Sequence, residues 1–229
     1  MIKAAIYGFS LFLILFSACS HGPGQSGLIL AGSTSIQPFA DRWAEVYTEK
    51  HRGAKVTVQG GGSSAGIQAA RSGAAHIGMS SRELKPEEKD LREIEVARDG
   101  LAVIVHPSNP LQSLTLLQVR SIFNGEVRNW HILNGADREI DVVTREEGSG
   151  TRGAFQELVM GQERIFKGAI VQDSNGTVRE IVAGDPQAVG FISLGLVNDR
   201  VKALRLDGVA AGRRPSGVKS TSWCGLSCS

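Results

Sequence analysis

The feature that most constrains the fold is a repeated alternation of short β-type runs with helical runs, joined by glycine and serine clusters. The first series predicts strands at residues 28–31, 55–59 and 75–79 and helices at residues 38–50 and 67–71. Each strand segment is short and rich in apolar residues, and each helical segment carries apolar side chains at helical spacing. Such alternation is typical of a parallel sheet with helices on its faces.

A second series follows a strong break in the pattern. Residues 101–105 are almost wholly apolar, which favours a buried strand, and the turn-forming run His106-Pro107-Ser108-Asn109-Pro110 comes directly after them. The series then predicts helices at 116–123, 151–160 and 177–183 and strands at 140–144, 169–171 and 189–193. We therefore expect an α/β protein of two lobes, each a mixed, mostly parallel sheet flanked by helices.

The same breaks divide the chain into segments. We expect a signal peptide at 1–19, a tether at 20–27, a first lobe at 28–106, a second lobe at 107–193, a return to the first lobe at 194–212 and an atypical, disordered tail at 213–229. The tail is assigned as disordered because it has little apolar periodicity. Cys224 and Cys228 lie in it, and two thiols four residues apart predict neither a zinc site nor a disulfide framework.

The N-terminus has the pattern of an export signal. Lys3 precedes an apolar run over residues 6–16, which is too short to span a bilayer, and small residues follow it up to Cys19. A cysteine at this junction resembles the lipobox of bacterial lipoproteins and predicts lipidation of Cys19 at the mature N-terminus. The alternative is a chance cysteine in an ordinary signal peptide. Either interpretation places the protein in the periplasm or at the outer cell surface.

Composition excludes several function classes. The 229 residues are 41% hydrophobic and carry a net charge of only +2, so no basic face predicts binding to nucleic acid. The sequence has no His, Cys and carboxylate cluster at metal-ligand spacing, no P-loop lysine and no well-placed dinucleotide fingerprint, so neither a metal nor a cofactor is expected. Trp43 and Trp130 are interpreted as core or interlobe packing.

Three junctions share one design, in which a predicted strand ends in a glycine and serine cluster and a predicted helix begins. They are Gly32-Ser33-Thr34-Ser35, Gly60-Gly61-Gly62-Ser63-Ser64-Ala65-Gly66 and Glu147-Gly148-Ser149-Gly150-Thr151. The first turn of a helix offers unpaired N–H groups and a partial positive charge, and hydroxyls add further donors. Simple helix capping is the alternative for any one loop. Capping does not require triple glycine, so the three together favour an anion site.

Other residues extend this prediction. Arg145 offers a permanently charged, bidentate grip on an oxyanion, unless it forms a surface salt bridge with Glu146 or Glu147. Ser80 and Ser81, at the end of the strand at 75–79, are a fourth donor cluster, with Arg82 a weaker candidate. Because ligands bind beyond the carboxyl ends of strands in open α/β sheets, the site is expected in a cleft between lobes that close by a hinge motion.

These segments resemble the phosphate-binding lipoproteins of bacterial phosphate ABC transporters, within the periplasmic-binding-protein superfamily. The matching segments are GSTSIQPFA from Gly32, VQGGGSSAGI from Val58, IGMSSREL from Ile77, VIVHPSNPL from Val103, IFNGEVRNW from Ile122, TREEGSGTR from Thr144 and AVGFISLG from Ala188. The resemblance implies a type II two-lobed fold that is not an enzyme. It further implies phosphate held by Ser33, Thr34, Ser35, Ser63, Ser64, Arg145, Ser149, Gly150 and Thr151, and a membrane permease as partner of a monomer.

Two departures accompany this resemblance. Larger relatives have an aspartate where this chain has Ser81, and that carboxylate accepts the proton of hydrogen phosphate. In this chain Glu83, Glu146 or a serine oxygen would have to accept that proton. The tail from Gly212 onward also lacks the family's pattern of Tyr, Pro and Leu, as a truncated or frame-shifted gene would.

Three other functions stay open. Sulfate, molybdate or another oxyanion can replace phosphate, and the same fold can serve a sensor or adhesion lipoprotein. The remote alternative is a serine hydrolase, because Gly62-Ser63-Ser64-Ala65-Gly66 matches the G-x-S-x-G elbow and would make Ser64 a nucleophile.

Overall fold

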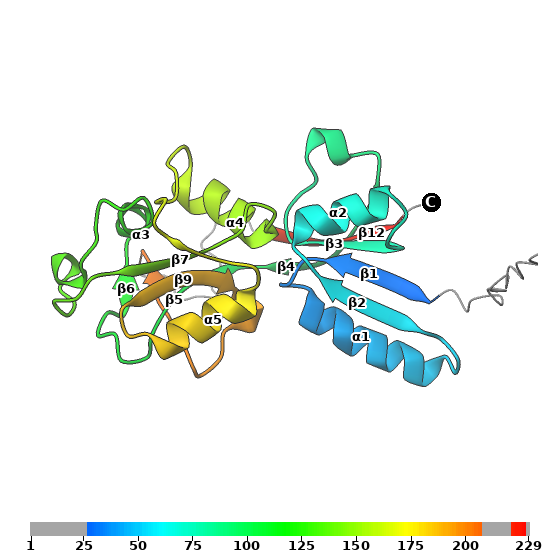
Figure 1. Cartoon of the computed structure of the whole chain (residues 1–229), viewed down its shortest axis with the longest axis horizontal. Coiled ribbons are helices and arrows are strands. Elements are labelled where there is room, and N and C mark those ends of the chain that lie inside the picture. The colour runs from blue at the N-terminus through cyan, green and yellow to red at the C-terminus, as the bar shows by residue number, and fades with distance from the viewer. Residues whose placement is uncertain (1–26, 208–220, 228–229) are drawn as a thin grey trace, which may run out of the picture.

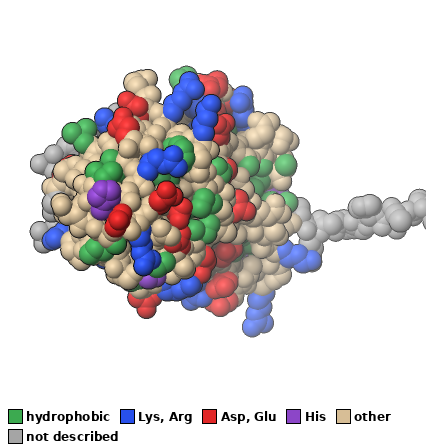
Figure 2. All heavy atoms as spheres, turned by 60° about the vertical axis from the view of Figure 1, so that its left-hand side comes forward, with side chains coloured by type: hydrophobic (Ala, Val, Ile, Leu, Met, Phe, Trp, Pro, Cys, Tyr) green, Lys and Arg blue, Asp and Glu red, His purple; other side chains and the backbone are tan. Residues whose placement is uncertain are grey.

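The structure is a computed structural model that describes residues 27–207 and the backbone of residues 221–227. Two α/β lobes lie side by side along the long axis of the molecule (Figure 1). Figure 2 shows a face on which Lys and Arg side chains are interspersed with Asp and Glu, in keeping with the small net charge of +2. The predicted fold class, an α/β protein of two lobes with mixed sheets flanked by helices, is confirmed.

The first lobe contains a sheet of five strands among the described residues, in the order β2-β1-β3-β12-β4. Its strands are β1 (Leu28–Gly32), β2 (Val56–Gly60), β3 (Ile77–Ser80), β4 (Arg92–Asp99) and β12 (Thr221–Ser227). β1 runs parallel to β2 and β3, whereas β12 runs antiparallel to β3 and β4. Helices α1 (Gln37–Lys50) and α2 (Ser63–Arg71) lie on opposite sides of this sheet (Figure 1). This follows from right-handed crossovers that run in opposite directions, from β1 to β2 and from β2 to β3.

The second lobe also contains five strands among the described residues, in the order β10-β5-β9-β7-β8. Its strands are β5 (Leu101–Val105), β7 (Asp141–Arg145), β8 (Ile170–Gln172), β9 (Ala188–Ser193) and β10 (Lys202–Ala203). Its helices are α3 (Leu116–Phe123), α4 (Gly150–Phe155), which continues as the π-helical turn η3 (Gln156–Met160), and α5 (Asn175–Gly184). A small sheet pairs β6 (Ser113–Leu114) with β11 (Arg205–Leu206), and the short helices are η1 (Pro86–Glu88), η2 (Trp130–Leu133) and η4 (Leu194–Leu196).

Local sequence explains where several helices begin. Pro38 lies in the first turn of α1, where a missing N–H costs nothing. Thr115 and Ser174 cap α3 and α5, each accepting a hydrogen bond from the backbone three residues on. Because these caps fix the first turn, they also fix the direction in which each helix points toward the sheet edge.

The cores of the two lobes differ in size. In the second lobe Phe123, Phe155 and Phe191 are fully buried, and the Phe155 and Phe191 rings stack with centroids 4.0 Å apart. The first lobe buries smaller groups, and its helix α2 approaches the sheet so closely that a Cβ on Gly66 would lie 2.5 Å from the carbonyl oxygen of Ala31. Only glycine allows that approach, which brings the beginning of α2 next to the ends of β1 and β3.

The expected lobe boundaries need correction in three places. Strand β5 belongs to the second sheet, so the chain passes between lobes at Asp99 and Gly100 and not at residue 106. Residues 202–207 stay in the second lobe, because β10 pairs with β5 and β11 with β6; the return to the first lobe was expected at 194–212. The hydrophobic pattern did not reveal this pairing because β10 and β11 are only two residues long.

The third correction concerns the tail. Part of the segment expected to be disordered, β12, is a strand inserted between β3 and β4. Strand β4 itself was not predicted, since most of its residues are exposed and their polarity does not mark a buried strand. The signal peptide, Cys19, the tether up to residue 26 and residues 208–220 and 228–229 lie outside the described residues.

The two tryptophans have different environments. Trp130 is buried and its Nε1 donates to the carbonyl oxygen of Gln187, so its assignment to the core is confirmed. Trp43 lies on α1 with 47% of its surface exposed, which contradicts its assignment to core or interlobe packing.

Candidate anion-binding site between the lobes

Hydroxyl groups from three places in the first lobe meet at the carboxyl ends of β1 and β3. Ser33 follows β1, Ser81 follows β3 and Ser63 begins α2. The Ser33 hydroxyl donates to Ser81 Oγ at 2.9 Å, and the Ser63 and Ser81 hydroxyls lie 3.3 Å apart. The Ser81 backbone N–H also donates to Ser63 Oγ at 3.0 Å. All three side chains are buried, so they form a compact cluster of donors and acceptors shielded from bulk water.

The beginning of α4 in the second lobe packs directly against this cluster. Ser149 caps α4 by accepting from the backbone N–H of Arg152, as the capping interpretation expected. A Cβ on Gly150 would lie 2.3 Å from Ser63 Oγ and 2.5 Å from Ser81 Oγ. Thr151 Oγ1 and Ser35 Oγ are 2.8 Å apart and share a hydrogen bond across the lobes. The helix beginnings of both lobes therefore converge on one place.

Arg145 ends β7 and is only 1% exposed, and its partner Glu146 lies against Gly62, next to Ser63 of the cluster. Its Nε and Nη2 donate to the carboxylate of Glu146 and to the carbonyl oxygens of Gln172 and Asp173. Its third nitrogen, Nη1, is buried without a hydrogen-bond partner among the described residues. Burial lowers the pKa of Arg145, although Glu146 acts in the opposite direction. The side chain thus forms the expected pair with Glu146 in a buried position, with one donor unused.

Asn175 is a site residue that sequence reasoning missed. It is 1% exposed, and its Nδ2 donates to Ser35 Oγ at 2.9 Å and to Thr34 Oγ1 at 3.2 Å. Its Oδ1 accepts from the backbone N–H of Ser193 at 3.1 Å. The signal was present, because Asn175 and Gly176 follow a strand and the capping residue Ser174, the same design as the three predicted loops.

The Asn175 contacts continue to the passage between the lobes. The Ser193 hydroxyl donates to Asp99 Oδ2 at 2.5 Å, and Asp99 Oδ1 accepts from the backbone N–H of Gly100. Asp99 ends β4 and Gly100 separates it from β5, so these bonds lie where the chain crosses from one lobe to the other. Any hinge motion at this crossing would alter the geometry of Asn175 and of the hydroxyls that it holds.

The structure gives other hydrogen bonds to the remaining predicted residues, which are Ser64, Ser80 and Arg82. The Ser64 backbone N–H donates to the Gly148 carbonyl oxygen across the lobes at 3.1 Å. Ser80 does not join the cluster, because its hydroxyl donates to the carbonyl oxygen of Arg82 and shapes the turn after β3. Arg82 forms a partly buried pair with Glu88 and reaches Ser64 Oγ at 3.3 Å. The hydrogen bonds from Arg82 lower the pKa of Glu88 to about 2.

The two carboxylates considered as proton acceptors lie in different places. Glu83 is exposed. Glu146 lies against the first lobe, since a Cβ on Gly62 would come within 2.9 Å of its Oε1, but its carboxylate already pairs with Arg145. Ser81 therefore sits in the cluster with hydroxyl groups as its immediate side-chain neighbours.

The contacts of Ser64 argue against a nucleophile. Its hydroxyl accepts from the Arg82 guanidinium, which has no acceptor atom and cannot take a proton from the serine. His106 Nδ1 is hydrogen-bonded to Ser108 Oγ, and His131 Nδ1 lies 3.6 Å from Asp137 Oδ1.

No group of three or more His, Cys, Asp or Glu side chains within residues 27–207 is arranged to hold a metal ion. None of the described helices is both long and apolar enough to cross a membrane.

Two lobes that meet through helix beginnings and buried hydroxyls define the class of two-lobed solute-binding proteins. A family model described as a PBP superfamily domain matches residues 17–220, and the chain belongs to this family.

Curated relatives and solved structures agree with this assignment. The "Phosphate-binding protein PstS" of Bacillus subtilis (strain 168) is 33% identical over 198 residues, which cover 84% of this chain and 66% of the relative. The protein of the same name from Borreliella burgdorferi is 30% identical over 213 residues, covering 88% of this chain and 76% of the relative. The chain thus spans about two thirds to three quarters of the length of these relatives.

Among solved structures, one from Clostridium perfringens is described as a "Putative Phosphate ABC Transporter Substrate-Binding Protein with Bound Phosphate". It is 39% identical, has a TM-score of 0.83 and is matched over 88% of this chain and 86% of that one. An ABC-type phosphate transport receptor from Vibrio cholerae is 36% identical with a TM-score of 0.68, over 87% and 86% of the two chains.

Proposed function

We propose that this protein binds inorganic phosphate between its lobes and delivers it to an ABC-type phosphate importer. The observation that carries the proposal is the convergence of buried hydroxyls from both lobes beside a buried arginine whose Nη1 has no partner. A buried, unpaired guanidinium donor is costly unless an anion completes its hydrogen bonds. The names of the relatives and the phosphate in the Clostridium perfringens structure support phosphate as that anion.

The chemistry of binding follows from the donors present. Ser33, Ser35, Ser63 and Thr151 now share hydrogen bonds with other hydroxyls or amides, and each hydroxyl can turn its proton toward a ligand oxygen. Backbone N–H groups at the beginnings of α2 and α4 add donors with partial positive charge. Arg145 supplies a full charge. Binding and release need no covalent bond to be made or broken.

Another oxyanion, such as sulfate or molybdate, is the second candidate ligand, and Ser81 is the observation that favours it. A carboxylate facing the ligand would reject a fully ionised anion, whereas a hydroxyl can either donate or accept. The nearby Glu146 carboxylate is engaged by Arg145 and is a poor substitute. We therefore expect weaker discrimination between phosphate and sulfate than a carboxylate in place of Ser81 would give.

Calorimetric titration tests both candidates. The mature protein is titrated with phosphate and then with sulfate, each at pH 6 and pH 8. Saturable binding of phosphate at one site supports the proposal. If neither phosphate nor sulfate gives a heat of binding, and neither competes with the other, the proposal is overturned. A Ser81→Asp variant is the matched comparison, since it should lose sulfate binding and keep phosphate binding.

We further propose that Cys19 is lipidated and anchors a monomer to the membrane, with residues 20–27 as a tether to the folded part. The support is the sequence pattern of the first residues, which lie outside the described part of the chain. A Cys19→Ser variant should shift the protein from the membrane fraction to the soluble fraction and lose incorporation of radiolabelled palmitate. Unchanged fractionation and labelling would exclude Cys19 as the anchor.

Transport is tested separately from binding. Deletion of the gene should reduce uptake of radiolabelled phosphate. Expression of the protein with Cys19 intact in the deletion strain should restore that uptake. Normal uptake in the deletion strain, together with phosphate binding in vitro, would favour a sensor or adhesion lipoprotein with the same binding site.

A further inference from the structure

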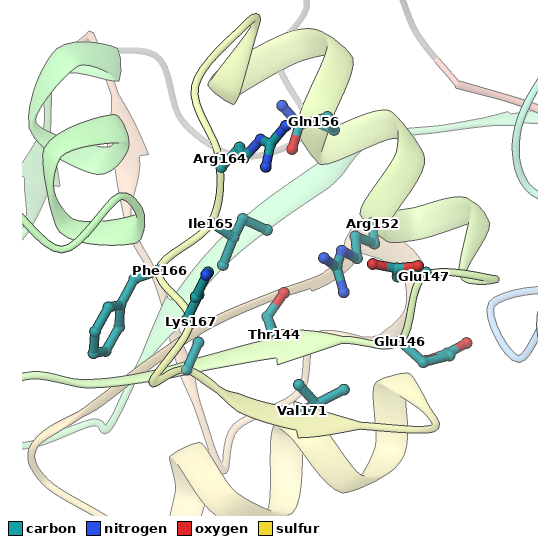
Figure 3. A pocket seen from close by; sticks show the side chains of 11 residues that line it. Thr144, Glu146, Glu147, Arg152, Gln156, Arg164, Ile165, Phe166, Lys167 and Val171 are labelled. Carbon is teal, nitrogen blue, oxygen red and sulfur yellow. The ribbon is translucent and has the colours of Figure 1, made fainter.

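A pocket lies in the second lobe, on the other side of β7 from Arg145. Its volume is about 600 Å³, within the range typical of sites for small organic ligands, and far larger than a tetrahedral ion needs. Thr144 and Arg145 are neighbours on β7, and successive side chains of a strand point to opposite faces. Thr144 therefore lines this pocket together with Val171 of β8, its partner in the sheet (Figure 3).

The Thr144 hydroxyl is the observation that points to a ligand. The side chain is 2% exposed, and Oγ1 has no hydrogen-bond partner among the described residues. Figure 3 shows this oxygen directed toward the space between Arg152 and Lys167. A buried hydroxyl without a partner is unfavourable, and a ligand oxygen seated between these two cations would provide one.

The charges around the pocket favour an anion. Within the described part of the chain, Arg164 and Lys167 form no ion pair, and the one side-chain hydrogen bond of Arg152 goes to the carbonyl oxygen of Arg145. The carboxylates that line the pocket are Glu146 and Glu147, and Glu146 is already neutralised by Arg145. The balance is positive and is concentrated where Figure 3 shows Arg152 and Lys167 on either side of Thr144.

The rest of the lining selects the kind of anion. Ile165 and Val171 give the pocket an apolar wall, which inorganic phosphate cannot use. Glu147 lies at the edge nearest Arg152 and can accept hydrogen bonds from hydroxyl groups (Figure 3). We infer that this pocket binds a small phosphate monoester that carries hydroxyl groups, with its phosphate between Arg152, Lys167 and Thr144 and its carbon chain along the apolar wall.

The test uses glycerol 3-phosphate as the probe and observes backbone amides by nitrogen-15 NMR. One equivalent of inorganic phosphate is present so that the site between the lobes is occupied first. Saturable shifts at the amides of Thr144, Lys167 and Val171 support the inference. Shifts confined to Ser63 and Ser81 place the probe in the interlobe site and overturn it. Glycerol is the neutral comparison, and equal shifts with glycerol would also overturn it.

Two variants and a control separate binding from folding. Lys167→Glu should weaken the probe about tenfold, since it replaces an attraction with a repulsion. Lys55→Glu makes the same charge change at an exposed site in the first lobe and should leave the affinity unchanged. Thr144→Val should weaken the probe several-fold without lowering the thermal midpoint, because the hydroxyl bonds to nothing in the protein. A lower midpoint with unchanged probe affinity would show that Thr144 is purely structural.

The outcomes also distinguish this inference from the proposed phosphate function. If inorganic phosphate gives no shifts anywhere but glycerol 3-phosphate perturbs Thr144 and Lys167, the proposal for the interlobe site fails. The inference for the pocket in the second lobe is then supported. If phosphate perturbs Ser63 and Ser81 and the probe adds nothing, the reverse holds.

Discussion

At the scale of single residues, Arg145 is the charge on which anion binding depends. Replacing it with Ala removes a charge-assisted hydrogen bond and leaves a buried anion under-compensated, so we predict a loss of about 2 kcal/mol, or roughly thirtyfold in phosphate affinity. Calorimetry measures the change. Arg42→Ala, which removes an exposed arginine of α1 paired with Glu45, is the control and should bind as the native protein does. Native affinity in Arg145→Ala would remove Arg145 from the site.

Asn175 makes a second prediction at this scale. Asn175→Asp keeps the oxygen that accepts from Ser193 but replaces the Nδ2 donor to Ser35 and Thr34 with a negative charge. We expect phosphate affinity to fall at least about tenfold, because the new charge repels the anion, and the urea midpoint to fall as well, because the carboxylate is buried without a cation beside it. Asn198→Asp, at an exposed turn, makes the same substitution away from the site. Equal affinities in the two variants would contradict a role for Asn175 in binding.

Much of the site was predictable at this scale, for a physical reason. A strand that ends in glycine and serine before a helix brings donors to a sheet edge whatever the rest of the chain does, so Ser33, Ser63 and Thr151 could be predicted from local pattern. The orientation of a hydroxyl depends on its neighbours, and for that reason Ser80 was placed in the site although it bonds to the turn at Arg82. Asn175 shows the same loop design but lacks the repeated glycines that drew attention to the other loops.

At the scale of elements, the beginning of α4 fits against α2 and β3 only because residue 150 is glycine. Gly150→Ala adds a methyl group at the first residue of α4, where alanine favours a helix less than it does in a helix interior. The added Cβ would meet Ser63 Oγ and Ser81 Oγ at less than 3 Å and so oppose contact between the lobes. Phosphate affinity should therefore fall about tenfold or more. Gly153→Ala, one turn of α4 away and free of such close contacts, is the matched control.

The pair of Arg82 and Glu88 gives the turn after β3 a dependence on pH. The pKa of Glu88 is lowered from 4.5 to about 2, mainly by its hydrogen bonds with Arg82. A lowered pKa means that the ionised form stabilises the fold, so this contribution is complete above about pH 4.5 and is lost as the pH falls toward 2.

We predict that the free energy of unfolding falls more steeply from pH 5 to pH 2.5 in the native protein than in Glu88→Gln, by up to about 3 kcal/mol. Urea denaturation at each pH measures this difference. Glu45→Gln, which alters an exposed pair on α1, should keep the native slope. Parallel curves for the native protein and Glu88→Gln would refute the assignment.

At the scale of the whole molecule, alternation of strands and helices predicted the class of fold but not every lobe boundary. The sequence of β5 predicts a buried strand but does not show which lobe it belongs to. Its place in the second sheet depends on pairing with β9, far away in the sequence. Strands β10 and β12 likewise take their place from partners and not from their own pattern. Local periodicity identifies elements, whereas long-range pairing decides which sheet they join. The two lobes nevertheless bring the predicted loops together, as the position of the loops at strand ends required.

The most direct test of the account is a crystal structure of the protein grown with phosphate. We predict density for one tetrahedral ion between the lobes, within hydrogen-bond distance of Arg145 Nη1 and of hydroxyls from both lobes, among them Ser35 and Thr151. An ion held by one lobe alone, or none at this position at saturating phosphate, would contradict the central claim.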